Sequence, residues 1–358
     1  MKLRLKQQKY IRYCLKVARR AEKRRLSKRR SIKAQRRSFL GLTAEGRRLV
    51  YLRRPWRIIL TAPEHFAFLK DPNNVINFIE KLESLLIQVK QEGKELYVDI
   101  WHVFQIDHAT LSALIAVLYR ARKDGVQVNG NWPKDNITKQ IFKSSGFIYT
   151  LFSNDPDAGT RFDINKDNQL FTSNNHDIIL VGEMSDGVAD FITGGKNKLG
   201  GLYMTLGELM DNAVSHSGND GRWWLSINYD RGKKKAKFVF IDYGVGIFTS
   251  LSEKLETHRV KSIWQKAVTL FGIEAMDEQL KAVITESAAE VYNLEGGHGE
   301  GIHGIYQTFK RGEIDSLHIV SNKAFGDVFN DKYLRLNGDF KGTMYYWEVS
   351  EKNVIINP

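Results

Sequence analysis

Two polar side chains with helical spacing, Glu208 and Asn212, could do chemistry. They lie in the segment MTLGELMDNAVSHSG, whose apolar residues recur at helix intervals. A separation of four residues puts both side chains on one face of a helix. An amide oxygen suits Mg²⁺, whose octahedron water and substrate phosphates would complete, and the carboxylate could take a proton from an attacking water. Taken alone, the pattern fits the polar side of an amphipathic helix better.

A second carboxylate, Asp242, follows a predicted strand over residues 236–241. Gly244 and Gly246 come directly after it, and glycines let a backbone pass close to another group. A buried aspartate needs hydrogen-bond donors, and the exocyclic amine of adenine is one. Guanine has an acceptor at that place, which a carboxylate would reject. A tight turn, in which the aspartate bonds its own backbone, explains the pattern equally well.

Glycines gather in a third segment, EGGHGEGIHGIYQTF, which spans residues 295–309. Their spacing is that of a dinucleotide-binding loop, but such a loop directly follows a strand, and the preceding residues show no strand pattern. We therefore expect a mobile lid, then a glycine turn, then a helix over about residues 302–310. Backbone N–H groups of such a turn and helix start bind anions, and the lid would cover phosphates.

These three motifs, followed by FKGTMYYWEV, stand in an order that resembles the GHKL ATP-binding fold. That family includes DNA gyrase, heat-shock chaperone ATPases, mismatch-repair proteins, sensor histidine kinases and anti-sigma kinases. The resemblance covers about residues 181–349. It implies that Glu208 activates water, that Asn212 ligates Mg²⁺ and that Asp242 binds adenine. The ATP-binding residues that it implies are Asp211, Asn212, Asp242, Gly244, Gly246, Gly297, Gly299, Gly301 and Thr343.

Predicted strands and helices alternate over residues 55–148, which favours a mostly parallel sheet covered by helices. The stretch YVDIWHVFQIDHATLSALIAVLYRARKDGVQV resembles a STAS domain, the small module of anti-sigma-factor antagonists. In that family a serine at the start of the helix is phosphorylated, whereas here the stretch reads Asp107-His108-Ala109-Thr110. We therefore carry over the fold and not the phosphorylation switch. Asp107 and Thr110 are predicted to form a helix N-cap.

The N-terminal segment holds the basic charge of the chain. Residues 1–40 contain 17 Lys and Arg and one acid, a net charge of +16, while the whole chain carries +13, so the remaining residues sum to −3. An anionic partner would relieve the repulsion between these charges in a helix, and RNA or DNA phosphates are the best candidates. A solvated tail or another acidic partner is the alternative, while the thin apolar stripe argues against a membrane. The proposed contacts are Arg19, Arg20, Arg24, Arg25, Lys28, Arg29, Arg30, Arg36 and Arg37.

Composition limits the class of protein. Apolar residues make up 42%, and a single cysteine, Cys14, excludes an internal disulfide framework and a cysteine-rich zinc site. The longest apolar run is too short to span a bilayer, so we expect a cytoplasmic protein. The predicted fold class is α+β, a GHKL-type α/β sandwich preceded by a STAS-like α/β domain and a basic helix. The expected domains are a basic helical arm at 1–54, a STAS-like domain at 55–148, a linker at 149–177 and a GHKL ATP-binding domain at 178–358.

These features together predict a Mg²⁺-dependent ATPase module that ATP switches by ordering the lid. It would act in a complex with nucleic acid, with a protein partner or as a homodimer, for instance in bacterial regulation or defence. Two alternatives stay open. One is an anti-sigma-type protein Ser/Thr kinase, in which Glu208 would deprotonate a substrate hydroxyl. The other is a non-catalytic scaffold that ATP stabilises.

Overall fold

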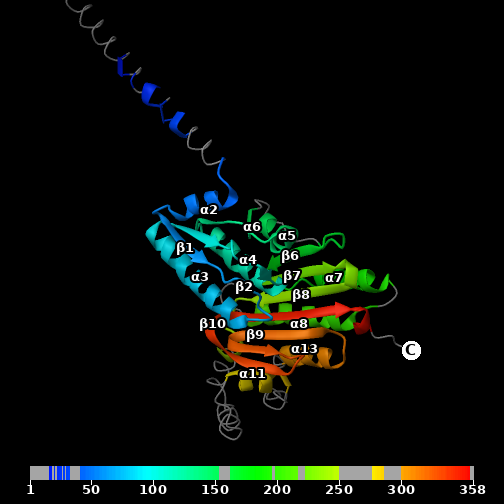
Figure 1. Cartoon of the computed structure of the whole chain (residues 1–358). Coiled ribbons are helices and arrows are strands. Elements are labelled where there is room, and N and C mark those ends of the chain that lie inside the picture. Colours follow the sequence, from blue (N-terminus) through cyan, green and yellow to red (C-terminus); the bar gives the residue numbers. More distant parts are fainter. Residues whose placement is uncertain are drawn as a thin grey trace, which may run out of the picture. The chain divides into compact units, whose positions relative to one another are not determined.

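The computed structural model describes residues 16–17, 20, 22–25, 27–28, 30–32, 41–152, 162–195, 198–216, 222–249, 276–285 and 300–354 (Figure 1). The chain divides into two compact units, residues 1–57 and residues 58–358. Helices and strands are both abundant, which confirms the mixed α+β class.

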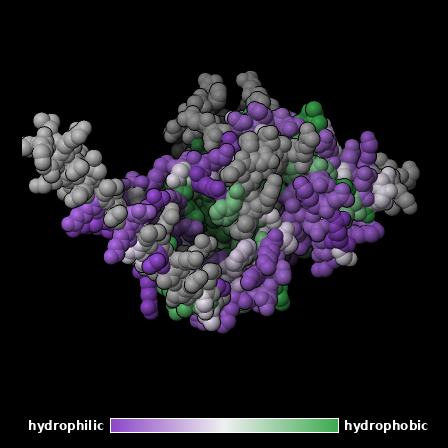
Figure 2. All heavy atoms as spheres, turned by 90° about the horizontal axis from the view of Figure 1, so that it is seen from above, coloured by the Kyte–Doolittle hydropathy of each residue, from purple (hydrophilic) through white to green (hydrophobic). Residues whose placement is uncertain are grey.

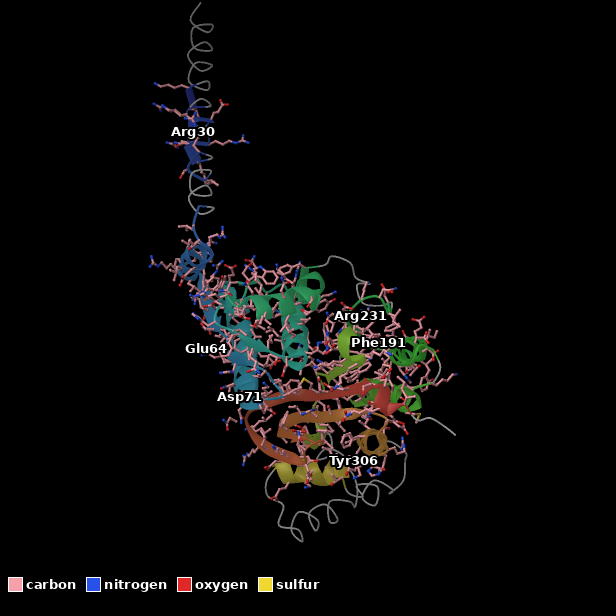
Figure 3. All side chains as sticks on the ribbon, turned by 45° about the vertical axis from the view of Figure 1, so that its right-hand side comes forward. Arg30, Glu64, Asp71, Phe191, Arg231 and Tyr306 are labelled. Carbon is pink, nitrogen blue, oxygen red and sulfur yellow. The ribbon has the colours of Figure 1, made fainter. Side chains whose placement is uncertain are left out.

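The first unit contains the basic arm. Its described residues between positions 16 and 32 are helical and exposed to solvent. Among the predicted nucleic-acid contacts, the exposed ones are Arg20, Arg24, Arg25, Lys28 and Arg30, and Figure 3 shows Arg30 pointing away from its helix. The others lie outside the described residues: Arg19, Arg29, Arg36 and Arg37. Helix α2 (Ala44–Leu52) follows, and its N-cap Thr43 accepts a hydrogen bond from the Gly46 amide at 3.1 Å.

The second unit begins with a small α/β region. Its three-stranded sheet has the order β1-β3-β5, and β3 and β5 run parallel. The strands are β1 (Arg57–Thr61), β3 (Glu95–Asp99) and β5 (Val128–Gly130), and a parallel pair is formed by β2 (His65–Phe66) and β4 (Gln105–Ile106). The helices are α3 (Pro72–Glu92), α4 (His108–Lys123), α5 (Asn136–Ser144) and α6 (Phe147–Phe152). Gly125 follows the end of α4 and Gly146 follows the end of α5, and both have positive φ angles, as glycines after helix ends often do.

The start of α4 has the predicted N-cap. Asp107 is the N-cap residue, and its carboxylate accepts hydrogen bonds from the Thr110 amide at 2.8 Å, the Thr110 hydroxyl at 2.6 Å and the Leu69 amide at 2.8 Å. The Thr110 hydroxyl in turn accepts from the Phe68 amide at 2.8 Å, and the residue is fully buried. The Thr110 hydroxyl therefore has a structural role and is closed to a phosphorylating enzyme.

The rest of the second unit is built on a five-stranded antiparallel sheet with the order β6-β7-β8-β10-β9. Its strands are β6 (Asn168–Ser173), β7 (Trp223–Asp230), β8 (Lys235–Asp242), β9 (Asp315–Asp327) and β10 (Lys332–Ser350). The helices are α7 (Ile178–Thr193), α8 (Gly200–His216), α11 (Met276–Thr285) and α13 (Glu300–Lys310), with short 3₁₀ turns at η1 (Arg231–Lys233) and η2 (Glu351–Asn353). Strand β6 comes from the range expected as a linker and forms one edge of this sheet.

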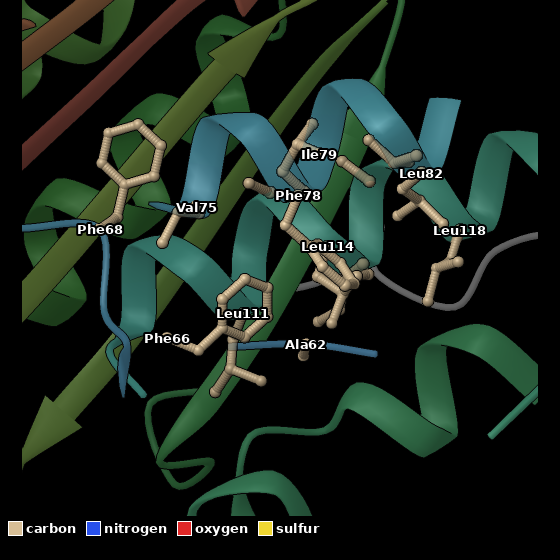
Figure 4. Packing of buried hydrophobic residues seen from close by; sticks show 14 of the residues in the cluster. Ala62, Phe66, Phe68, Val75, Phe78, Ile79, Leu82, Leu111, Leu114 and Leu118 are labelled. Atoms are coloured by element: carbon tan, nitrogen blue, oxygen red, sulfur yellow. The ribbon is translucent and has the colours of Figure 1, made fainter. Parts of the chain in front are cut away.

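Both faces of the five-stranded sheet are covered, because side chains alternate between faces along each strand. One face packs against α7, α8, α11 and α13 in a cluster that includes Phe238, Phe240 and Trp347. The other face packs against α3 and α4 in a cluster that includes Val239 and Ile241. Figure 4 shows α3 and α4 lying side by side over the strands. The ranges expected as two domains, 55–148 and 178–358, therefore share one hydrophobic core.

Two polar contacts illustrate how the elements are tied together. His108, at the start of α4, lies 3.0 Å from the Ser226 hydroxyl of β7, and burial lowers the pKa of this imidazole to about 4. The Arg231 guanidinium lies over the Phe191 ring at 5.7 Å, which joins η1 to the end of α7 (Figure 3).

The face seen in Figure 2 is mostly hydrophilic, with apolar side chains visible in a recess near its centre. Within the described ranges, no helix combines the length and the apolar character that crossing a bilayer requires.

Candidate functional site

The candidate site lies at the edge of the sheet where β8 ends. Asp242 is the last residue of β8, and it pairs with Trp223 at the start of β7 and with Thr343 of β10. Two residues earlier, Phe240 belongs to the cluster under α7 and α8, as does Tyr345 of β10. Because side chains two residues apart share a face, Asp242 and Thr343 project to the face that α8 covers.

Asp242 is partly buried and has few donors. Its Oδ1 accepts the Gly244 amide at 3.0 Å, and its carboxylate also accepts a hydrogen bond from the Thr343 hydroxyl. Burial outweighs both bonds and raises the pKa of this carboxyl from 3.8 to about 6. A further hydrogen-bond donor would stabilise this buried carboxylate, and the amine of a ligand is such a donor.

Gly342 makes the contact between the two strands possible. Its φ angle is +107°, and a Cβ atom there would lie 1.9 Å from the Asp242 carbonyl oxygen. Any other residue would push β10 away from β8 next to Thr343. The Gly342-Thr343 pair thus brings the threonine hydroxyl to Asp242.

Ser321 of β9 is a site residue that the sequence did not reveal. Its hydroxyl accepts the Ile247 amide at 2.8 Å, donates to the Gly342 carbonyl at 2.9 Å and lies 3.3 Å from the Thr343 hydroxyl. Ser321 is fully buried. One hydroxyl therefore joins the loop after Asp242 to the Gly342-Thr343 turn.

Asn322 holds the same loop beside it. Its Oδ1 accepts the Phe248 amide and its Nδ2 donates to the Val245 carbonyl, both at 3.3 Å. Gly246 has a φ angle of +81°, and a Cβ atom there would lie 2.4 Å from the Asn322 side chain. The close approach expected at this glycine is to Asn322 of the protein itself. The sequence does show a polar Ser-Asn pair inside the otherwise apolar β9 segment. Its closeness to Asp242, however, follows only from the register in which the strands pair.

Helix α8 reaches the same end of the sheet. Asp211 Oδ1 lies 2.6 Å from His176 Nδ1, and the neighbouring Asn175 carbonyl accepts the Trp223 indole N–H at 2.9 Å. Trp223 is the strand partner of Asp242. This short chain of contacts places the C-terminal half of α8 near the Asp242 edge, and it shows that the Asp211 carboxylate pairs with a histidine.

Glu208 and Asn212 share a face of α8 with Gly201. Glu208 lies seven residues after Gly201 and Asn212 lies four residues after Glu208, and both spacings follow the helical repeat. Both polar residues are partly buried. A Cβ atom on Gly201 would lie 2.5 Å from the Glu313 Cβ and 2.7 Å from Cγ2 of Thr308, which belongs to α13. Helix α13 therefore packs against the face of α8 that carries Glu208 and Asn212.

The glycine segment is described only in part. Gly297 and Gly299 lie outside the described residues, and so does the predicted lid that precedes them. Gly301 falls in the first turn of α13, which begins at Glu300, two residues before the predicted start. The structure thus brings Asp242, Gly244, Gly246 and Thr343 into one cluster, places the C-terminal half of α8 near it and packs α13 against α8.

No group of three or more His, Cys, Asp or Glu side chains gathers into a metal site in the described ranges. A Mg²⁺ ion that takes one protein oxygen, with the rest from water and phosphates, does not need such a group. The partly buried Asn212 oxygen is compatible with that kind of site.

A separate cavity of about 180 Å³ lies between β3, β5, α4, α5 and α6, away from this edge. Its walls are mainly apolar, with aromatic residues such as Trp132 and Phe142. The polar groups at its rim bond to the protein: Arg122 donates to the Leu151 carbonyl, and Asn131 donates to Asp99 at 2.5 Å. Its charged lining residue, Arg122, is engaged by the protein itself, and the cavity includes none of the candidate-site residues.

Comparison of the chain with protein-family models, with curated proteins and with solved structures finds no match. Function therefore has to be inferred from the site itself.

Proposed function

We propose that this chain is an ATP-binding, Mg²⁺-dependent ATPase module of the GHKL type, joined to a STAS-like region and a basic arm. The observation that carries the proposal is the Asp242 carboxylate. It ends a buried strand, it has a pKa raised to about 6, and it projects to the sheet face that α8 covers. A carboxylate kept short of donors at that position suits the exocyclic amine of adenine.

The other residues are proposed to contact different parts of the nucleotide. Thr343 and the loop through Gly244 and Gly246 shape the base end, with Ser321 holding both in place. Asn212 and the start of α13 are on the side proposed for the phosphates. Mg²⁺ bound there would neutralise phosphate charge. Glu208, on the same face of α8 as Asn212, is the proposed proton acceptor for water.

The STAS-like region is proposed as a scaffold without a phosphorylation switch. The Thr110 hydroxyl is buried and fully engaged by Asp107 and the Phe68 amide. An acceptor hydroxyl has to reach a phosphate donor, which this one does not.

Incubation of the purified full chain with γ-labelled ATP and Mg²⁺ tests the proposal, alone and with RNA or DNA. We expect labelled inorganic phosphate and no label on the protein. Label on the chain or on an added protein would support a kinase instead. Bound but unchanged ATP would support a scaffold, and no binding of ATP would refute the nucleotide site itself.

We also propose that the arm binds nucleic acid phosphates, because its described basic side chains between positions 16 and 32 are all exposed. Replacing Arg20, Arg24, Arg25, Lys28 and Arg30 with glutamine should weaken duplex DNA or RNA binding at least tenfold at low salt. Each lost phosphate contact lowers the slope of log affinity against log salt by about 0.9 on B-DNA. Fluorescence anisotropy at several salt concentrations measures both quantities. The same affinity and slope in the variant and the parent would exclude the arm as the binding element.

A further inference from the structure

Tyr243 connects the candidate site to the opposite layer of the fold. It follows Asp242 directly, and it packs against the α3–α4 cluster on the other face of the sheet. Its hydroxyl lies 3.5 Å from the Ala113 carbonyl of α4. The Arg120 guanidinium, also on α4, lies over its ring at 4.1 Å from the centroid. The residue after the proposed base contact is thus held by one helix of the STAS-like region.

One carboxylate of α3 connects the Arg120–Tyr243 contact with β10, the strand that carries Thr343. Glu83, whose side chain is only 10% exposed, lies 3.4 Å from Arg120 through Oε1 and 3.4 Å from Lys341 through Oε2. Lys341 directly precedes the Gly342-Thr343 pair on β10. Glu83 is buried, so removing a partner cation would leave its carboxylate poorly compensated. Glu83 therefore links two points next to the site: the residue after Asp242, through Arg120 and Tyr243, and the middle of β10 beside Thr343, through Lys341.

We propose that Glu83, Arg120 and Tyr243 are positioning residues that hold the base-binding loop in its binding conformation from the far side of the sheet. The inference rests on the proposed ATP site and adds to it a physical link with the α3–α4 layer. Since coupling between two sites is reciprocal, a partner that shifts α3 or α4 would change nucleotide affinity, and nucleotide would change the affinity for that partner.

The test compares ATP with inorganic tripolyphosphate, which lacks the base, by calorimetry. Arg120→Met removes the guanidinium over Tyr243 and one of the two cations beside Glu83. We expect ATP to bind about tenfold more weakly and tripolyphosphate to bind unchanged, because only the base end is displaced. Arg120→Lys keeps the charge and loses the planar stacking. Its affinity for ATP should therefore lie between that of the parent and that of Arg120→Met. Lys90→Met is the control, since it removes a cation of α3 that pairs with Asp124 at 3.8 Å, and both side chains of that pair are exposed.

The outcomes separate the inference from the function on which it rests. If the parent binds ATP and Arg120→Met binds it equally well, the positioning role is wrong. Equal weakening of ATP and tripolyphosphate would show general destabilisation and also overturn it. If the parent does not bind ATP at all, the proposed function fails and this inference fails with it.

A second measurement needs no variant. Hydrogen exchange of the parent should slow in α4, residues 108–123, when ATP binds on the other face of the sheet. Bound ATP with no change in exchange there would contradict the link.

Discussion

Asp242→Asn is expected to stabilise the nucleotide-free chain at neutral pH and to abolish binding of adenine nucleotides. Burial raises the carboxyl pKa from 3.8 to about 6, so the charged form is disfavoured in the folded state. That unfavourable contribution is fully present above pH 6 and disappears as the pH falls below the ordinary value of 3.8. Asparagine removes the charge and keeps an oxygen for the Gly244 amide. The gain in unfolding free energy is about 2–3 kcal/mol at pH 7.5 and near zero at pH 3.5.

Urea unfolding at both pH values and ATP titration at pH 7.5 measure the two effects. Asp331→Asn is a suitable control, because it changes an exposed carboxylate in the turn between β9 and β10. A variant that gains no stability at pH 7.5 would show that Asp242 is well solvated. A variant that still binds ATP would show that another group recognises the base.

Local patterns predicted the elements that carry the site. The strand before Asp242 was expected over residues 236–241 and extends from 235 to 242. The helix after the glycine segment was expected from residue 302 and begins at 300. Alternation in a strand and helical spacing are properties of a few consecutive residues, so the sequence alone reveals them. The roles proposed for these residues remain predictions.

The features that the sequence did not reveal depend on pairing between strands that lie far apart in the chain. Ser321 and Asn322 support the loop proposed to bind the base only because β9 pairs with β10 in one register, which places Ser321 opposite Thr343. Likewise, β6 joins the sheet through pairing with β7, whose paired residues lie fifty to sixty positions further along the chain. Register is set by which side chains bury together, and a single sequence does not show those partners.

The amino-acid sequence of α4 reflects its position between two sheets. Its buried residues include Ala109, Leu111, Ala113, Leu114 and Ala116, which point in several directions around the helix. A helix that is apolar all round is covered on every side. That pattern already indicated a second layer beyond the small sheet, and this layer is the five-stranded sheet that carries the candidate site.

Glu208→Gln is expected to remove turnover and to spare nucleotide binding. The substitution keeps the size of the side chain and its place on the α13-facing side of α8, and it removes the carboxylate that would accept the proton. Loss of a general base typically lowers turnover by 10² to 10⁴, so phosphate release should fall by about that factor while the Kd for ATP stays within about threefold of the parent. Release of labelled phosphate and calorimetry measure the two quantities.

Glu183→Gln is the matched control for this variant, because it makes the same change at an exposed carboxylate of α7. We expect it to retain more than a third of the parent rate. Turnover at the parent rate in Glu208→Gln would mean that another group accepts the proton. Loss of ATP binding in Glu208→Gln would mean that the side chain supports the fold or the phosphate end, since a base acts only on the reacting water. If label reaches a protein instead of water, the same variant should remove that label, because the carboxylate would then deprotonate a hydroxyl in place of water.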